Sequence, residues 1–209
     1  LGGLLTGAVL MWVYMRLQTV QAPVNEDELA RATAKPLTDA MARAQRFTDA
    51  LDFGRAAPAW REAARLAPKN LEVLKAWFES ARHHPGSEDF HGAARLIFKL
   101  PASTDAERQL QLSSYRTYRQ RAKPSARMSV DTMHGLVRNF VRIGALPEAE
   151  KLCQSLHKAS DHPHWPATLL LLVNGMAQAG QIQQAKSWLP ALQQAAPQDP
   201  VTRWLAQLG

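Results

Sequence analysis

The sequence has a single cysteine, Cys153, among its 209 residues, which excludes an internal disulfide. The absence of disulfides agrees with a reducing compartment. From Leu37 to Leu208 there is no run of alternating β-branched residues that would predict strands, and the apolar periodicity is helical, broken at Gly and Pro. The sequence therefore predicts an all-α fold.

Charge is missing from the start of the chain, because residues 1–15 contain no Asp, Glu, Lys or Arg and Arg16 is the first charged residue. At about 1.5 Å per residue this run covers roughly two thirds of the 30 Å hydrocarbon core. We therefore interpret residues 1–20 as the C-terminal part of a transmembrane helix whose first turns are missing. Arg16 at the exit of this helix favours a cytoplasmic location for the rest of the chain.

Two other interpretations of residues 1–20 remain open. A secretory signal peptide would place its cleavage site near Val20 to Ala22, but the run lacks the charged segment that precedes the apolar part of such peptides. A buried helix of a soluble domain is disfavoured because every face of the run is apolar, whereas the rest of the chain is amphipathic.

Two glycines of the apolar run, Gly3 and Gly7, are four residues apart, a spacing that lets another helix approach closely in a membrane. The string LGGLLTG at residues 1–7 resembles the last core helix of the rhomboid family of intramembrane serine proteases. In that family a catalytic His is followed by two residues, Gly, three residues and Gly. Gly3 and Gly7 match the two packing glycines, and the His would immediately precede Leu1.

This resemblance implies peptide-bond hydrolysis inside a membrane, with the His accepting the proton of a serine hydroxyl that attacks the peptide carbonyl. The family's serine lies on a neighbouring helix in a Gly-x-Ser-x-Gly-like segment, which this chain lacks. We therefore expect no catalytic residue within the chain. The family also implies a bacterial inner membrane, with the helical domain in the cytoplasm. The alternative is a simple membrane anchor with incidental glycines, carrying a non-enzymatic adaptor or scaffold.

Residues 21–36 have the composition of a linker, with Pro23, several acids, and Pro36 at the end. We expect one short helix within it, between Asp27 and Ala34. A helical domain then extends over residues 37–209.

Residues 52–70 resemble the second helix and closing proline of a tetratricopeptide repeat. Their pattern recurs three more times, each with a small Ala where helices would cross closely. The four sets are Phe53, Ala56, Trp60, Ala63 and Pro68; Phe90, Ala93, Ile97 and Leu100; Leu146, Ala149, Cys153 and Leu156; and Ile182, Ala185, Leu189, Leu192 and Pro197.

A first helix is expected before each of these sets, at residues 37–51, 71–82, 128–143 and 166–179. Residues 104–125 form a helical insert or a degenerate half-repeat, and residues 201–208 a terminal capping helix. Such helix pairs bury their apolar faces only by stacking, which predicts an α-solenoid with a surface for a protein or peptide partner. The alternative is a stack that only stabilises or spaces the membrane part.

The net charge of +7 raises the possibility of a nucleic-acid partner. The basic residues are densest in one stretch that also contains two tyrosines: Arg116, Arg119, Arg121, Lys123 and Arg127, with Tyr115 and Tyr118. A solvated helix face is the simplest interpretation, and contact with an anionic membrane leaflet is a second. No nucleic-acid motif accompanies the charges, so we expect no nucleic-acid partner.

Cys153 and His157 lie one helical turn apart, and His162 and His164 follow in a loop, a set of side chains that zinc accepts. Against a zinc site, Cys153 occupies a repeat core position, Pro163 separates the loop histidines, and neither a paired Cys motif nor His-Glu-x-x-His is present. We therefore expect neither a metal nor another cofactor. Ser87, ahead of two acids, is expected to cap a helix rather than to act as a nucleophile.

Overall fold

In a computed structural model, the structure describes residues 26–122 and 128–208, with side chains from Lys35 onward. The described residues form helices and contain no strand, which confirms the all-α prediction. None of these helices is long and apolar enough to cross a membrane. The predictions for residues 1–20, including Gly3 and Gly7, lie outside the described residues.

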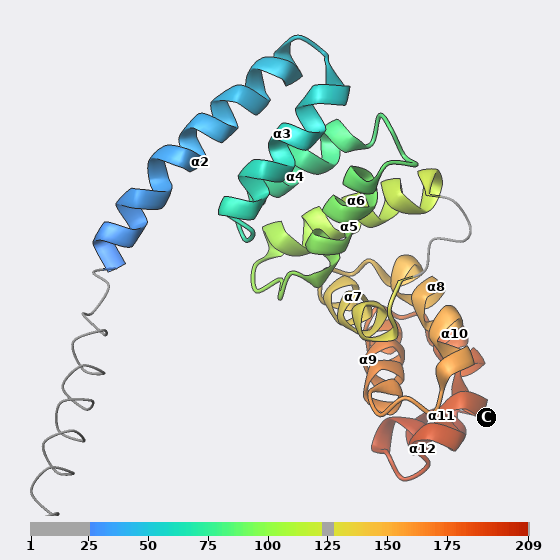
Figure 1. Ribbon diagram of the computed structural model, residues 1–209. Coiled ribbons are helices and arrows are strands. Elements are labelled where there is room, and N and C mark those ends of the chain that lie inside the picture. Colours follow the sequence, from blue (N-terminus) through green and yellow to red (C-terminus); the bar gives the residue numbers. More distant parts are fainter. Residues whose placement is uncertain (1–25, 123–127, 209) are drawn as a thin grey trace, which may run out of the picture.

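The helices follow one another through short connections (Figure 1). Their bounds are α2 Glu26–Asp49, α3 Phe53–Leu66, α4 Leu71–Ala81, α5 Glu88–Lys99, α6 Asp105–Arg121, α7 Val130–Arg142, α8 Leu146–Leu156, the 3₁₀ turn η1 His157–Ala159, α9 Trp165–Gln178, α10 Ile182–Ser187, α11 Leu189–Ala195 and α12 Pro200–Gln207.

Helix α2 differs from the expected short helix, because it begins at Glu26 and continues through Pro36 to Asp49. Proline lacks a backbone N–H and so removes one hydrogen bond from a helix interior. The residues around Pro36 are rich in Ala, Glu, Arg and Leu, which favour helix, and they sustain α2 on both sides of it. The short helix expected between Asp27 and Ala34 is therefore part of a longer helix that continues past Pro36.

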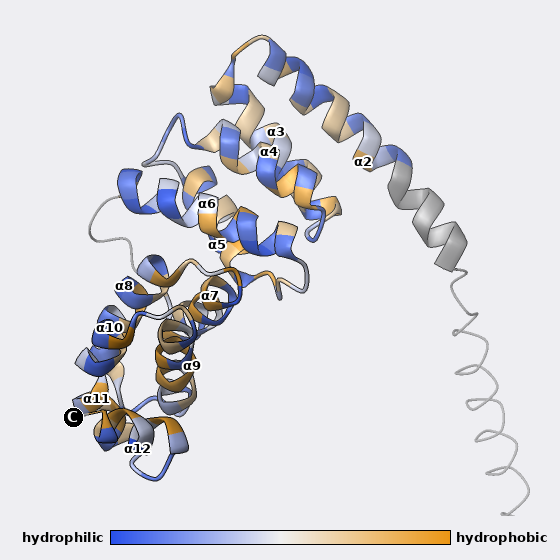
Figure 2. Ribbon diagram, turned by 180° about the vertical axis from the view of Figure 1, so that it is seen from behind, coloured by the Kyte–Doolittle hydropathy of each residue, from blue (hydrophilic) through white to orange (hydrophobic). Residues whose placement is uncertain are grey.

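The alanines of the repeated pattern lie at close contacts between helices, as the pattern predicted. Ala56, Ala93, Ala149 and Ala185 all have 0% exposure, and each stands on a helix that packs against its neighbours. A side chain of one carbon lets two helix backbones approach closely, which larger side chains would prevent. The helix pairs around them bury one continuous apolar core, and Figure 2 shows how hydrophobic α9 is within it.

The helices stack in two rows. The odd row consists of α3, α5, α7 and α9, since α3 contacts α5, α5 contacts α7, and α7 contacts α9. The even row consists of α4, α6, α8 and α10: α4 contacts α6, Arg116 of α6 pairs with Glu148 of α8 at 2.7 Å, and Trp188 at the end of α10 donates to Glu150 of α8 at 3.2 Å. Helix α6 is thus a full member of the stack, and α7 and α9, expected as first helices of pairs, share a row with the second helices α3 and α5.

Three connections between helices have the same backbone geometry. The amide of Asp52 donates to the carbonyl of Phe47 at 2.9 Å, that of Ala145 to Phe140 at 2.8 Å, and that of Gln181 to Met176 at 2.9 Å. In each case the residue before the donor has a positive φ: 56° at Leu51, 72° at Gly144 and 75° at Gly180. This arrangement ends a helix in the left-handed conformation and starts the next one two residues later.

A buried polar bridge joins the two halves of the stack between α5, α6 and α7. The side-chain amide of Gln111, with 0% exposure, donates to the carbonyls of Ile97 and Leu100 at 3.0 Å each. Asn139 of α7 donates to the Gln111 carbonyl oxygen at 2.9 Å. Gln111 therefore satisfies the last carbonyls of α5 and holds α7 against α6.

Candidate binding pocket

The four residues considered for zinc separate into three places. Cys153 is fully buried in the core, where burial first and the Glu150 carboxylate second raise the pKa of its thiol to about 12. His157 ends α8, with its ring 5.7 Å from that of Trp165. His162 and His164 lie in the loop before α9. Within the described residues, no three His, Cys, Asp or Glu side chains are arranged to hold a metal ion.

The two loop histidines instead contact His134 of α7, which sequence reasoning missed. The His134 ring stacks on that of His162 with centroids 4.8 Å apart, and the His164 ring lies at 5.9 Å. His134 is 2% exposed, and its Nδ1 forms a hydrogen bond of 2.8 Å with the Thr168 hydroxyl. The helical periodicity of residues 128–143 could have predicted the burial of His134, because it places this residue on the apolar face of the helix.

The environment of this histidine cluster opposes protonation of His134. Burial is the main cause that lowers its pKa to about 4, and the neighbouring His162 and His164 act in the same direction. Its Nε2 is buried and has no hydrogen-bond partner within the described structure. Asp131, at 3.3 Å from His162 Nε2, is the acidic group of the cluster. The cluster is thus built around a neutral imidazole.

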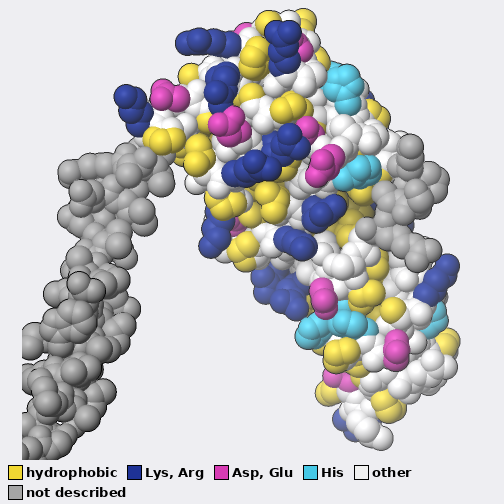
Figure 3. Space-filling view, in the orientation of Figure 1, with side chains coloured by type: hydrophobic (Ala, Val, Ile, Leu, Met, Phe, Trp, Pro, Cys, Tyr) yellow, Lys and Arg dark blue, Asp and Glu magenta, His cyan; other side chains and the backbone are white. Residues whose placement is uncertain are grey.

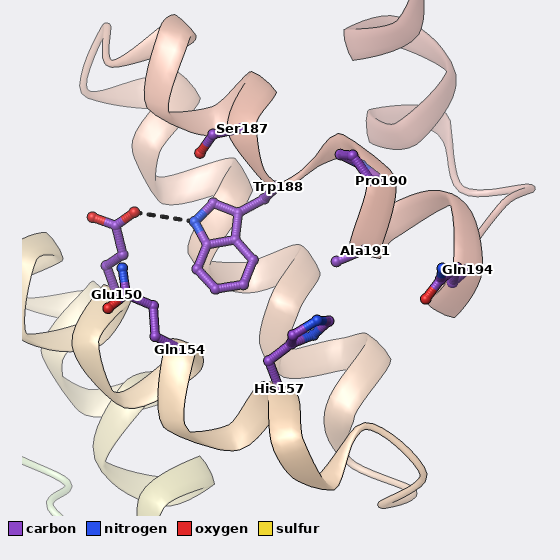
Figure 4. Close-up of a pocket in the computed structure, with 8 residues that line it drawn as sticks. All are labelled: Glu150, Gln154, His157, Ser187, Trp188, Pro190, Ala191 and Gln194. Carbon is purple, nitrogen blue, oxygen red and sulfur yellow. Dashed lines mark hydrogen bonds between the residues drawn. The ribbon is translucent and has the colours of Figure 1, made fainter.

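An open pocket of about 350 Å³ lies between α8 and the junction of α10 with α11 (Figure 4). From α8 and its end come Glu150, Gln154 and His157, spaced along one helix face. The other wall is formed by Ser187, Trp188, Pro190, Ala191 and Gln194. The pocket thus forms where α10 and α11 meet α8, which precedes them in the chain by more than one helix.

The Trp188 indole forms the inner wall of the pocket and is 8% exposed. Its Nε1 donates to Oε1 of Glu150 at 3.2 Å, which fixes the ring against α8 (Figure 4). This interaction leaves Oε2 of Glu150 as an acceptor. In the described part of the chain the indole is the one hydrogen-bond donor to this carboxylate. The pocket therefore presents an anionic oxygen next to an aromatic ring.

Two cations of the basic stretch, Arg116 and Arg121, have partners within the fold, whereas Lys123 and Arg127 lie outside the described residues. Tyr115 is buried, and the Tyr118 hydroxyl forms a hydrogen bond of 3.0 Å with His91 Nδ1. Arg116 pairs with Glu148, and Arg121 donates to the carbonyl of Arg82 at 2.9 Å. Figure 3 shows other Lys and Arg side chains spread over one face of the stack and interspersed with acids. The two tyrosines therefore contact protein side chains rather than forming a free aromatic surface between the cations.

Ser87 caps α5, as predicted, because its hydroxyl accepts a hydrogen bond from the Phe90 amide at 3.1 Å. The nearby His83 is exposed and its ring stacks on that of Phe53, with centroids 3.7 Å apart. Both residues serve the connection between α4 and α5 and its contact with α3.

Comparison of the chain with protein-family models, curated proteins and solved structures found no match.

Proposed function

We propose that the helical stack is a binding module for a protein or peptide, and that residues 1–20 hold it at a membrane. The observation that supports binding is the pocket between α8 and α10–α11, which the even row leaves open while the stack buries its core elsewhere. Stacked helix pairs commonly bind partners across such inter-helix surfaces. The pocket is concave, contains an aromatic wall and converges several polar groups, as binding sites do.

Site-specific photo-crosslinking in cells tests this proposal. A photoreactive residue replaces Gln154, an exposed residue at the pocket, and in a matched variant it replaces Lys69, an exposed residue in the α3–α4 connection. We expect a discrete crosslinked protein from position 154 and not from position 69. Identical patterns from both positions, or none from 154, would contradict a binding function for this surface.

The second part of the proposal is that the chain is the C-terminal portion of a rhomboid-like intramembrane serine protease, with the stack on the cytoplasmic side of a bacterial inner membrane. It rests on the string at residues 1–7, with Gly3 and Gly7 in the positions of the family's packing glycines. The competing proposal is an adaptor tethered by a single apolar anchor. In both, the stack recruits or positions a partner near the membrane.

Sequencing the transcript upstream of the codon for Leu1 separates these two proposals. The protease proposal requires a His immediately before Leu1 and a Gly-x-Ser-x-Gly-like segment on an earlier apolar span. Replacement of that Ser by Ala should then abolish cleavage of a membrane substrate without changing crosslinking from position 154. A short basic segment directly before the apolar run would overturn the protease proposal and leave the adaptor.

A further inference from the structure

We propose that the pocket between α8 and α10–α11 binds an arginine side chain of the partner, an inference that rests on the binding function proposed above. The argument begins with charge. Of the eight described residues that line the pocket, Glu150 is the one acid and none is Lys or Arg. The chain as a whole carries a net charge of +7, so the charge in this pocket is opposite in sign to that of the chain.

Hydrogen-bonding capacity also favours a cation with several donors. The Trp188 indole occupies one oxygen of the Glu150 carboxylate and leaves Oε2 available. Gln154 and Gln194 are exposed at the edge of the pocket and contribute amide oxygens as acceptors. A guanidinium has five N–H donors in one plane and no acceptor, so it suits a site that combines a carboxylate with amide oxygens.

The aromatic wall formed by Trp188 also favours an arginine side chain as the ligand. A guanidinium stacks on an aromatic ring, and tryptophan is the most favourable ring for a cation. The bond from Nε1 to Glu150 fixes the Trp188 ring before any ligand arrives, so binding requires little ordering of this side chain. Figure 4 shows Glu150 and Gln154 on one side of the indole, and His157 and Ala191 on the other.

The size of the pocket suits a single extended side chain. The volume of about 350 Å³ lies at the lower end of the range for small-molecule sites, and the pocket is open to solvent. A large cofactor does not fit, whereas one extended side chain from a neighbouring polypeptide does. The pocket thus acts as an anchor point, and the remainder of the partner would lie on the adjacent exposed surfaces of α8 and α11.

Nuclear magnetic resonance of the Trp188 indole N–H, assigned with a Trp188→Phe variant, provides the test. The probe is acetyl-arginine amide, titrated into the full chain, with acetyl-citrulline amide as a neutral analogue of nearly equal shape. We expect a saturable shift of the Trp188 signal with arginine, in the millimolar range for so small a ligand, and a much smaller shift with citrulline.

Two variants on α8 complete the experiment. Glu150→Gln keeps an acceptor for the indole but removes the charge, and should raise the dissociation constant for arginine about tenfold or more. Glu148→Gln removes one charge from the same helix, but Glu148 faces Arg116 and does not line the pocket, so arginine binding should be unchanged. Circular dichroism verifies that both variants remain folded.

Absence of a shift, equal shifts with citrulline, or an unchanged dissociation constant in Glu150→Gln would each overturn the arginine assignment. If arginine does not bind while crosslinking from position 154 still captures a discrete partner, the ligand is wrong and the binding function stands. If neither occurs, both proposals fall.

Discussion

Leu51 occupies a position at the end of α2 that the other two connections of the same geometry give to glycine. Its φ of 56° places a side chain in the left-handed region, where non-glycine residues are disfavoured by about 1–2 kcal/mol. The Leu51 side chain is 72% exposed, so it contributes little packing in return. A glycine here would relieve the backbone strain, but the larger conformational entropy of the unfolded chain would offset part of that stabilisation.

We therefore expect Leu51→Gly to raise the free energy of unfolding by up to about 1 kcal/mol. Urea titration followed by circular dichroism measures it. The matched substitution Gly144→Ala, at a φ of 72°, should lower stability by a similar amount. A lower urea midpoint for Leu51→Gly would show that the leucine contributes contacts that outweigh its backbone strain.

Also at the residue scale, His134 should make stability depend on pH. Its pKa is about 4 in the folded chain and 6.5 ordinarily, so the unfolded chain binds the proton more readily between these values. Stability is therefore complete above pH 6.5 and falls as the pH drops toward 4, by about 2 kcal/mol between pH 7 and pH 5. His162, His164 and Asp131 face the ring, so a variant at position 134 is needed to isolate the contribution of His134.

His134→Asn removes this titration and retains a polar atom near Thr168. Unfolding free energies at pH 7 and pH 5 should differ less in this variant than in the parent chain. His84→Asn, which changes an exposed histidine between α4 and α5, serves as the control and should keep the parent's pH dependence. Equal pH dependence in His134→Asn and the parent would assign the effect to other groups.

At the scale of helices, the crossing of α9 over α7 and α8 depends on Gly175. A Cβ atom at this position would lie 2.8 Å from Cγ1 of Val141 and 3.3 Å from Cδ2 of Leu146. Val141 is β-branched and has few alternative rotamers on a helix, so α9 must move away. Gly175→Ala should cost about 1–3 kcal/mol through overpacking, despite the better helix propensity of alanine.

Thermal unfolding tests this prediction, and Gly135→Ala is the control, because a Cβ atom at Gly135 in α7 meets nothing within 4 Å. The control should be neutral or stabilising, by up to about 1 kcal/mol. In the double variant Gly175→Ala with Val141→Ala the loss should diminish. Equal melting temperatures for Gly175→Ala and the parent would mean that α9 can shift away from Val141 at no cost.

The helices themselves were largely predictable from the sequence, for reasons that individual residues make clear. The period of Ala56, Trp60 and Ala63 reports a helix packed on one face, and Gly144 and Gly180 mark helix ends. Three features were not predictable. Pro36 continues within α2 because the surrounding residues favour helix, and the contacts of α6 depend on packing that no local pattern encodes. The pocket was missed for the same reason, since Glu150 and Trp188 meet only in three dimensions.

For the whole molecule, the interface between the half ending at α6 and the half beginning at α7 determines whether the stack unfolds as one unit. Gln111 and Asn139 form its buried hydrogen bonds, and the rings of Tyr115 and Phe140 lie 5.4 Å apart beside them. Gln111→Leu preserves volume but leaves the Leu100 carbonyl and the Asn139 side-chain amide unpaired, and it removes one of the two hydrogen bonds to the Ile97 carbonyl. We expect a loss of about 1–3 kcal/mol and a less cooperative transition in urea.

Gln109→Leu is the matched control, because Gln109 is exposed on the same helix. It should leave both the midpoint and the slope of the transition unchanged. The comparison of two spectroscopic probes, tryptophan fluorescence and circular dichroism, detects separate unfolding of the halves. Superimposable transitions of unchanged slope in Gln111→Leu would indicate that apolar contacts alone couple them.

Helix α6 is a single helix inserted between helix pairs, and it changes which helix of each later pair lies in which row. Before α6 the second helix of each pair lies in the odd row, whereas after α6 the first helix does. Residues at the same position of the repeat pattern therefore face opposite sides of the molecule before and after α6. A partner that runs along the even row meets α4 as the first helix of its pair, but α8 as the second. Any transfer of residue roles between the two halves must therefore count helices, not repeats.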